Sequence, residues 1–224
     1  MEERYRSDYE GEFIITKSVI RGGKKIQDKE WIENPIENQH ISGRAVCIAD
    51  GESRSKFLIH RLQGHSGGLL GKLRLQSYGI GRVSDEIICN FYISRNTEQL
   101  EQVIEKEYTV HTVCYTSTKN CLTYPGEFYL VPYRVLGSDP LIAAYIACFD
   151  GHKEIFLLGY DYIDDKSTTA EITELMNTYK GTKFTRVSAG AKRHQFDNQT
   201  PEEWKWCSNF NEMSYIEWIS YCDV

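Results

Sequence analysis

Residues 138–161 constrain the fold of this chain more than any other segment. Ser138, Asp139 and Pro140 precede a run from Leu141 to Phe149 in which every side chain is apolar or aromatic. A small polar residue followed by proline is typical of a helix start, and Gly151 is typical of a helix end. The next segment, 154–158, has the composition of a buried strand. A helix that is apolar on every side must be covered, so this segment predicts a helix packed against a sheet.

The same alternation of strand and helix continues through the chain. Short apolar runs predict strands at 44–49, 73–78, 85–92 and 108–114, and helical spacing follows the first of them at Phe57, Leu58 and Leu62. Helices are expected at 96–105 with Asn96 as cap, at 168–179, and at 201–210 with Thr200 as cap. This rhythm predicts an α/β protein with a mostly parallel sheet and helices on both faces.

The first 42 residues differ from the rest in being largely polar. A hairpin is expected there, with its turn at 21–24, where two adjacent glycines stand between basic residues. We therefore expect an N-terminal β appendage over 1–42 and one domain over 43–224.

The charge balance argues against general affinity for polyanions. The chain has 26 Lys and Arg against 32 Asp and Glu, a net charge of -6, so any contact with nucleic acid must be local. Basic residues gather around 21–25, 61–82 and 180–193.

The seven cysteines include no Cys-x-x-Cys pair and lie mostly in apolar runs. This pattern indicates small buried side chains in a reducing, cytoplasmic setting. No apolar run approaches the length of a membrane span, and no two histidines or cysteines have a metal-binding spacing. We expect no membrane association, no protein-bound metal and no obligate protein partner.

Three polar clusters follow or precede the predicted core elements at one sheet edge. In parallel sheets, ligands bind beyond the carboxyl ends of the strands, so these clusters are the candidate substrate-binding residues. Each also has a plain structural interpretation, as a strand-to-helix turn, a helix cap and a cover of the sheet edge, respectively. The clusters are Asp50, Gly51, Glu52, Ser53 and Arg54; Ser138 and Asp139; and Gly159, Tyr160, Asp161 and Tyr162.

His194 is the candidate general base. It lies in the basic segment 191–195, which offers no apolar partner for the imidazole, whereas His60 and His111 lie in apolar surroundings and His152 lies in a helix-to-strand turn. An imidazole can remove a proton from an attacking hydroxyl near neutral pH.

These residues together resemble the small sialyltransferase-like glycosyltransferases. The likeness is carried by 46–54, by 138–162, by 177–182 and by a late Trp-rich helix; phage-encoded members that modify DNA have a similar Gly-Glu-Ser-Arg loop. The resemblance implies a Rossmann-like fold with a UDP- or CMP-linked sugar as co-substrate. It places Ser138 and Asp161 near the nucleotide, Tyr162 near the leaving phosphate and a histidine base in the late loop, a role that His194 fits. We also expect Tyr160 at the leaving phosphate and Tyr179 among the substrate-binding residues. The chain departs from the family pattern at Ala49 and Asp50, where glycine and asparagine are expected. It also departs near Gly81, where the asparagine expected after Tyr78 and Gly79 is replaced.

The resemblance also implies an acceptor, hydroxymethylated cytosine in phage DNA. A basic groove for DNA would then be formed by Arg74, Arg82, Lys180, Lys183, Lys192 and Arg193. A divalent cation bridging the donor phosphates is compatible with this pattern. Two other functions stay open. One is pyrophosphoryl transfer to a small metabolite. The other is a non-catalytic nucleotide-binding or partner-binding module, which Asp50 favours because a carboxylate close to a donor diphosphate would repel it and impair transfer.

Overall fold

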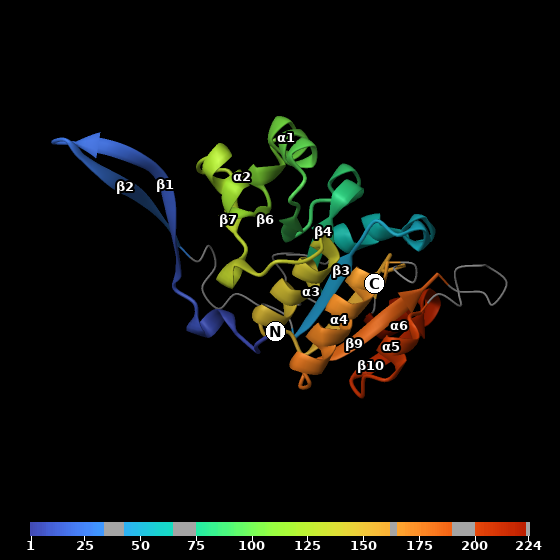
Figure 1. Ribbon diagram of the computed structural model, residues 1–224. Helices are drawn as coiled ribbons and strands as arrows, with labels where there is room; N and C mark the ends of the chain where they lie inside the picture. The colour runs from blue at the N-terminus through green and yellow to red at the C-terminus, as the bar shows by residue number, and fades with distance from the viewer. Residues whose placement is uncertain (34–42, 65–74, 162–164, 190–199, 223–224) are drawn as a thin grey trace.

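An eight-stranded parallel sheet forms the centre of the protein. The computed structural model describes residues 1–33, 43–64, 75–161, 165–189 and 200–222 (Figure 1). The strand order is β10-β9-β8-β3-β4-β5-β6-β7, and every described pairing is parallel. The strands are β3 (Arg44–Ile48), β4 (Gln76–Ile80), β5 (Phe91–Ile93), β6 (Val113–Thr116), β7 (Tyr129–Leu130), β8 (Glu154–Leu158), β9 (Lys183–Ser188) and β10 (Phe210–Ser214).

Helices cover both faces of this sheet. The helices are α1 (Thr97–Glu105), α2 (Thr118–Thr123), α3 (Asp139–Phe149), α4 (Lys166–Thr178), α5 (Glu202–Lys205) and α6 (Tyr215–Cys222). Short 3₁₀ turns are η1 (Arg6–Asp8), η2 (Glu52–Lys56), η3 (Ile59–Gly64), η4 (Gly81–Asp85), η5 (Tyr108–Val110) and η6 (Pro132–Arg134). The predicted α/β class with a parallel sheet is confirmed. No helix in the described part of the chain is both long and apolar enough to cross a membrane.

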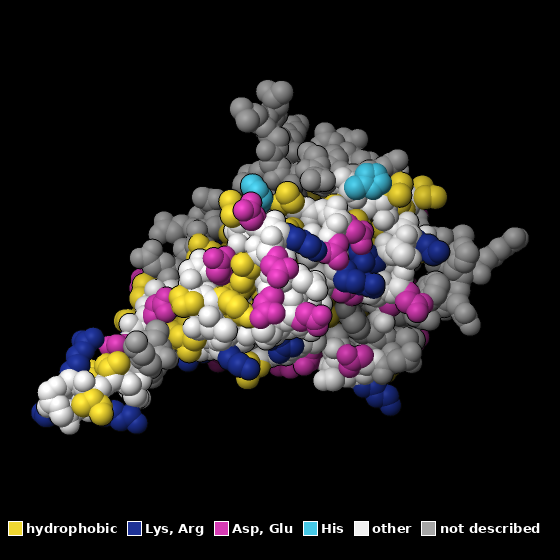
Figure 2. Space-filling view, turned by 90° about the horizontal axis from the view of Figure 1, so that it is seen from above, with side chains coloured by type: hydrophobic (Ala, Val, Ile, Leu, Met, Phe, Trp, Pro, Cys, Tyr) yellow, Lys and Arg dark blue, Asp and Glu magenta, His cyan; other side chains and the backbone are white. Residues whose placement is uncertain are grey.

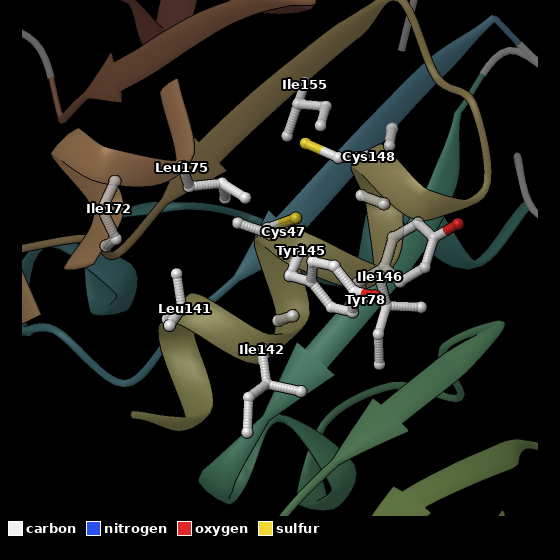
Figure 3. Close-up of a cluster of buried hydrophobic side chains, with 14 of the residues drawn as sticks. Cys47, Tyr78, Leu141, Ile142, Tyr145, Ile146, Cys148, Ile155, Ile172 and Leu175 are labelled. Atoms are coloured by element: carbon white, nitrogen blue, oxygen red, sulfur yellow. The ribbon is translucent and has the colours of Figure 1, made fainter. Parts of the chain in front are cut away.

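The alternation of side chains along β3 divides the core into two layers. Ala45 and Cys47 face α3 and α4, whereas Val46 and Ile48 face the layer that contains Trp218 of α6. All four residues of β3 named here are fully buried, which is why this strand is apolar at every position rather than at alternate ones. Figure 3 shows the first layer, where α3 lies against β3, β4 and β8.

Helix α3 confirms the prediction made from 138–151. Ser138 is its N-cap, Pro140 lies in the first turn, and every residue from Pro140 to Phe149 is buried. Gly151 follows with φ +86°, a conformation in which a Cβ would be strained.

The segment 85–92 differs from its predicted strand. Only Phe91–Ile93 pairs in the sheet, as β5. Residues 86–90, between η4 and β5, are not part of a strand. The Tyr108 hydroxyl takes the place of a strand neighbour there, because it donates to the Ile87 carbonyl at 3.0 Å and accepts the Cys89 N–H at 2.9 Å. The hydrogen-bonding groups of this backbone are thus satisfied by a side chain about 20 residues away, which local sequence patterns do not reveal.

The segment 201–210 also differs from prediction. Its helix, α5, ends at Lys205, and the chain then forms the edge strand β10 and helix α6. Thr200 does not cap α5; its hydroxyl contacts Arg186 and Glu212 instead. Thr200, which the sequence predicts to be a helix cap, thus binds the buried guanidinium of Arg186 instead.

The N-terminal hairpin is present as a two-stranded antiparallel sheet, β1 (Gly11–Arg21) and β2 (Lys24–Glu33), which projects from the body (Figure 1). The residues before it belong to the body. Tyr9 packs in the main core, and buried Arg6 pairs with Asp150 beneath the amino end of the sheet. The Asp150 carboxylate also accepts the Tyr78 hydroxyl at 2.6 Å, and burial raises the pKa of that phenol well above its usual value.

Candidate functional site

The strand order places a topological switch point between β3 and β8. From β3 the chain adds β4 to β7 on one side, then returns to add β8 to β10 on the other. Loops that leave β3 and β8 therefore turn toward opposite faces, and parallel sheets bind ligands at such a switch point. The first and third predicted clusters, at 50–54 and 159–161, follow these two strands.

Glycines let the two loops touch. The Gly51 N–H donates to the Gly159 carbonyl at 2.9 Å, and a Cβ on Gly51 would lie 2.2 Å from that oxygen. Gly159 has φ +71°, and a Cβ there would lie 2.5 Å from the Ala49 carbonyl oxygen. The sequence makes Gly51 a candidate substrate-binding residue; in the structure it permits close approach of the second loop.

A buried polar network joins the loops to β9. The Asp161 carboxylate accepts the Ser53 N–H at 2.7 Å and the Ser53 hydroxyl at 2.9 Å. It also accepts a guanidinium N–H of Arg186 at 3.0 Å. The side chains of Asp161 and Arg186 are only 6% and 1% exposed, so the pair is shielded from solvent. This network joins the loop at 51–54, the loop at 159–161 and β9.

Asp50, the departure from the family pattern, is engaged by the protein itself. Its carboxylate accepts the Arg82 N–H at 3.1 and 3.2 Å and lies 3.6 Å from the Arg54 guanidinium. Gly81 has φ +59°, and a Cβ on it would lie 1.5 Å from an Asp50 oxygen. The carboxylate therefore ties the end of β3 to the turn after β4, with its charge partly balanced.

Two arginines at the switch point have different surroundings. Arg54 is 9% exposed and pairs with both Asp50 and Glu86. Arg82 is exposed, and within the described residues its guanidinium makes no ion pair, although its backbone holds Asp50. Of the two arginines, Arg82 is thus the one whose guanidinium is exposed and makes no ion pair with a described residue.

The second predicted cluster begins α3 at the same sheet edge. Ser138 donates its N–H and hydroxyl to Glu171 of α4, at 3.0 and 2.7 Å, while accepting the Leu141 N–H at 3.4 Å. Asp139 pairs with Arg95, which follows β5, at 2.7 Å. These contacts fix the start of α3 to its neighbours.

Two candidate tyrosines lie in the core. Tyr160 is 1% exposed and donates its hydroxyl to the Pro140 carbonyl at 3.0 Å. Tyr179 is fully buried at the far end of α4, where its hydroxyl donates to the Arg4 carbonyl at 2.8 Å. These positions favour packing roles for both residues, with Tyr160 holding the start of α3 from below.

The basic residues proposed for DNA do not gather in one place. Lys180 and Lys183 lie at the amino end of β9, whereas Arg82 lies beyond the carboxyl end of β4, at the opposite sheet edge. Lys183 pairs with Glu154 at 3.2 Å. The remaining candidates fall outside the described residues; they are Tyr162, Arg74, Lys192, Arg193 and His194.

The structure adds residues that the sequence did not single out: Arg186, Glu171 and Arg95. Arg186 had little signal in the sequence, because β9 has only two apolar residues, Phe184 and Val187, and its burial is visible only in the structure. Among the described residues no group of three His, Cys, Asp or Glu side chains could hold a metal ion.

No protein-family model matches this chain, and no curated protein matches it. A solved structure with a similar chain path is the sialyltransferase CstII from Campylobacter jejuni, in complex with the substrate analogue cytidine-5'-monophosphate. It is 14% identical, with a TM-score of 0.44, over 70% of this chain and 85% of that one. The likeness concerns the chain path, and no residue of this chain takes a role from it.

Proposed function

We propose that this protein is a glycosyltransferase that moves a sugar from a UDP- or CMP-linked donor to an acceptor hydroxyl. The observation that carries the proposal is the β3–β8 switch point, where loops joined by the Ser53–Asp161–Arg186 network lie beside the exposed Arg82. Switch points of parallel sheets bind nucleotides because strand-end loops and helix starts converge there.

In this proposal the buried residues position the site and Arg82 binds the donor. Ser53, Asp161 and Arg186 satisfy one another, so they hold the loops at 51–54 and 159–161 in place. Arg82 supplies the positive charge for the donor phosphate, and Arg54 offsets the charge of Asp50. Gly51, Glu52 and Gly159 line the loops over which the nucleotide lies, while Ser138 and Asp139 border the switch point.

The chemical step needs a base and a stabilised leaving group. We assign the base to His194, which takes the acceptor hydroxyl proton as the oxygen attacks the anomeric carbon. The bond from that carbon to the donor phosphate oxygen breaks, and its electrons leave with the nucleotide. Tyr162 donates a hydrogen bond to this phosphate. Support comes from the flanks of 190–199: Ser188 ends β9 and Thr200 contacts Arg186, both at this edge.

The acceptor that we favour is hydroxymethylated cytosine in phage DNA, following the sequence resemblance. An extruded base would present its hydroxyl to the switch point. The experiment is incubation of the protein with such DNA and a panel of UDP- and CMP-linked sugars, with and without Mg²⁺, followed by mass analysis of the released nucleosides. A sugar-mass increase on the modified cytosine is expected.

Donor binding is tested separately by thermal shift. A bound nucleotide sugar raises Tm, because a ligand that binds only the native state stabilises it. Arg82→Gln keeps the backbone contact to Asp50 and should weaken nucleotide binding about tenfold, as expected for loss of one charge-assisted contact. Lys183→Gln, at the opposite sheet edge, is the matched control. No shift with any nucleotide sugar would refute the proposal.

The base assignment has its own test. His194→Ala should lower turnover by about 10² to 10⁴ while leaving the nucleotide-induced Tm shift intact. Turnover within about threefold of the unmutated protein would contradict the role of His194. Dependence on Mg²⁺-triphosphate without sugar transfer would instead indicate pyrophosphoryl transfer, and tight binding without any product would indicate a non-catalytic module.

A further inference from the structure

The outer part of the projecting hairpin, residues 17–29, carries a charge opposite in sign to that of the whole protein. Five basic residues and one acidic residue, Asp28, lie between Lys17 and Lys29, in a chain whose net charge is -6. Asp28 is only partly exposed and lies 3.5 Å from the Arg21 guanidinium. Figure 2 shows basic and apolar side chains together at the end of the hairpin, away from the acidic surface of the body.

The strand register sorts these side chains by face. Phe13 pairs with Trp31, before a bulge between Ile15 and Lys17, and Ile20 pairs with Lys25 after it. Because directly paired residues point to the same face of a sheet, one face continues past the bulge. In β2, Lys25, Lys29 and Trp31 occupy alternate positions and therefore point to this same face. No acidic residue lies on this face between 13 and 31.

This face is exposed and partly preorganised. Phe13, Ile20 and Trp31 are 56%, 77% and 41% exposed, and the Lys29 ammonium lies 5.6 Å from the Phe13 ring centre. Phe13 and Trp31 stack edge to face at 4.6 Å. Large exposed aromatics beside lysines are typical of surfaces that contact nucleic acid.

The base of the hairpin is held firmly against the body. Ile14, on the opposite face, is 1% exposed and packs with Tyr92 and Leu130. Arg134 pairs with Glu12 and also donates to the Phe13 carbonyl. A fixed base and a free tip make the hairpin a rigid arm.

We propose that the β1–β2 hairpin is a duplex-DNA-binding arm, with Lys25 and Lys29 on backbone phosphates and the Phe13–Trp31 pair against the groove. The proposal extends the proposed function, on which it rests for the choice of DNA. A two-stranded ribbon fits the major groove of B-form DNA, whereas that of A-form RNA is too narrow. The charge of the tip complements phosphate.

The test measures binding of a labelled 20-base-pair DNA duplex by fluorescence anisotropy at several salt concentrations. Lys25→Gln combined with Lys29→Gln should weaken binding between about tenfold and a hundredfold near 0.1 M salt, and lower the slope of log affinity against log salt by about 2. Lys119→Gln combined with Lys205→Gln, an equal charge change on the body, should leave both quantities unchanged.

Three further outcomes would refute the proposal that the hairpin binds duplex DNA. They are no DNA binding by the unmutated protein, equal losses in the two double variants, or equal binding of an RNA duplex. Binding of phosphatidylserine vesicles, or dimerisation, that depends on these lysines without any effect on DNA would also overturn it. The nucleotide-induced Tm shift should persist in the variant with both hairpin lysines replaced. If the unmutated protein also shows no such shift, the proposed donor site is refuted, whereas the DNA-binding role of the hairpin is judged by the anisotropy measurement alone.

Discussion

Arg186 and Asp161 form a buried ion pair whose partners depend on each other. Asp161 also accepts two hydrogen bonds from Ser53, and Arg186 donates to Thr200 at 3.1 Å. Removing one charge leaves the other buried without its counter-ion, which costs more than the net strength of the pair. At this scale the site is therefore sensitive to single substitutions that never touch a substrate.

Arg186→Met should lower the free energy of unfolding by about 3 to 5 kcal/mol, measured by urea titration. Lys183→Met, on the same strand but exposed, should change it by less than about 1 kcal/mol. Adding Asp161→Asn to Arg186→Met should restore part of the loss, because the stranded carboxylate is then neutral. If the double variant is no more stable than Arg186→Met, the ion pair is not the cause.

Gly81 and Gly126 provide a matched pair of positive-φ glycines. Gly81 has φ +59° and would place a Cβ against Asp50, whereas Gly126 has φ +86° with open space around it. Gly126→Ala should cost about 1 kcal/mol from backbone strain alone. Gly81→Ala should cost at least about 1 kcal/mol more, because it also displaces Asp50 from Arg82.

Adding Asp50→Ala to Gly81→Ala checks this reason. Removal of the carboxylate opens the space for the new Cβ, so the two substitutions should cost less together than the sum of their separate effects. Strict additivity in urea titrations would show that Asp50 is not the obstacle.

At the scale of elements, helix starts were the most reliable signals in this chain. The Asn96 side chain accepts the N–H groups of Glu98 and Gln99, and α1 begins where the sequence predicts it. Strand boundaries were less reliable. In both segments where prediction failed, a group bonds to a side chain elsewhere in the sequence: the Ile87 carbonyl accepts the Tyr108 hydroxyl, and the Thr200 hydroxyl accepts the Arg186 guanidinium.

Asn96→Ala should lower the free energy of unfolding by about 1 kcal/mol, because two N–H groups of the first turn lose their acceptor. Asn96→Asp keeps a cap oxygen and should be close to neutral. Urea denaturation followed by circular dichroism measures both. An equal loss in the two variants would mean that the amide group, rather than the cap oxygen, is required.

At the scale of the whole molecule, all seven cysteines are buried in the core layers. Burial raises the pKa of Cys89 and of Cys114 to about 12, and that of Cys47 well above its usual value. A thiol in this state is shielded from reagents and almost wholly protonated at neutral pH. The sequence interpretation of these residues as small hydrophobic side chains agrees with their positions.

The folded protein should therefore react slowly with a thiol reagent such as 5,5'-dithiobis(2-nitrobenzoate) at pH 8, and all seven thiols should react quickly in guanidinium chloride. The denatured sample is the control for reagent and count. Rapid labelling of one or more thiols in the native protein would contradict the burial.

The sequence by itself determined the layer architecture, because apolar continuity, caps and glycines act over a few residues and are readable in order along the chain. It also placed polar clusters at 50–54, 138–139 and 159–161 after or before the correct elements. Tertiary structure alone decided what those groups contact. The strand order set β3 beside β8, so Ser53 and Asp161, 108 residues apart, became hydrogen-bonding partners. Such pairing depends on which strands are neighbours, and local periodicity carries no information about that.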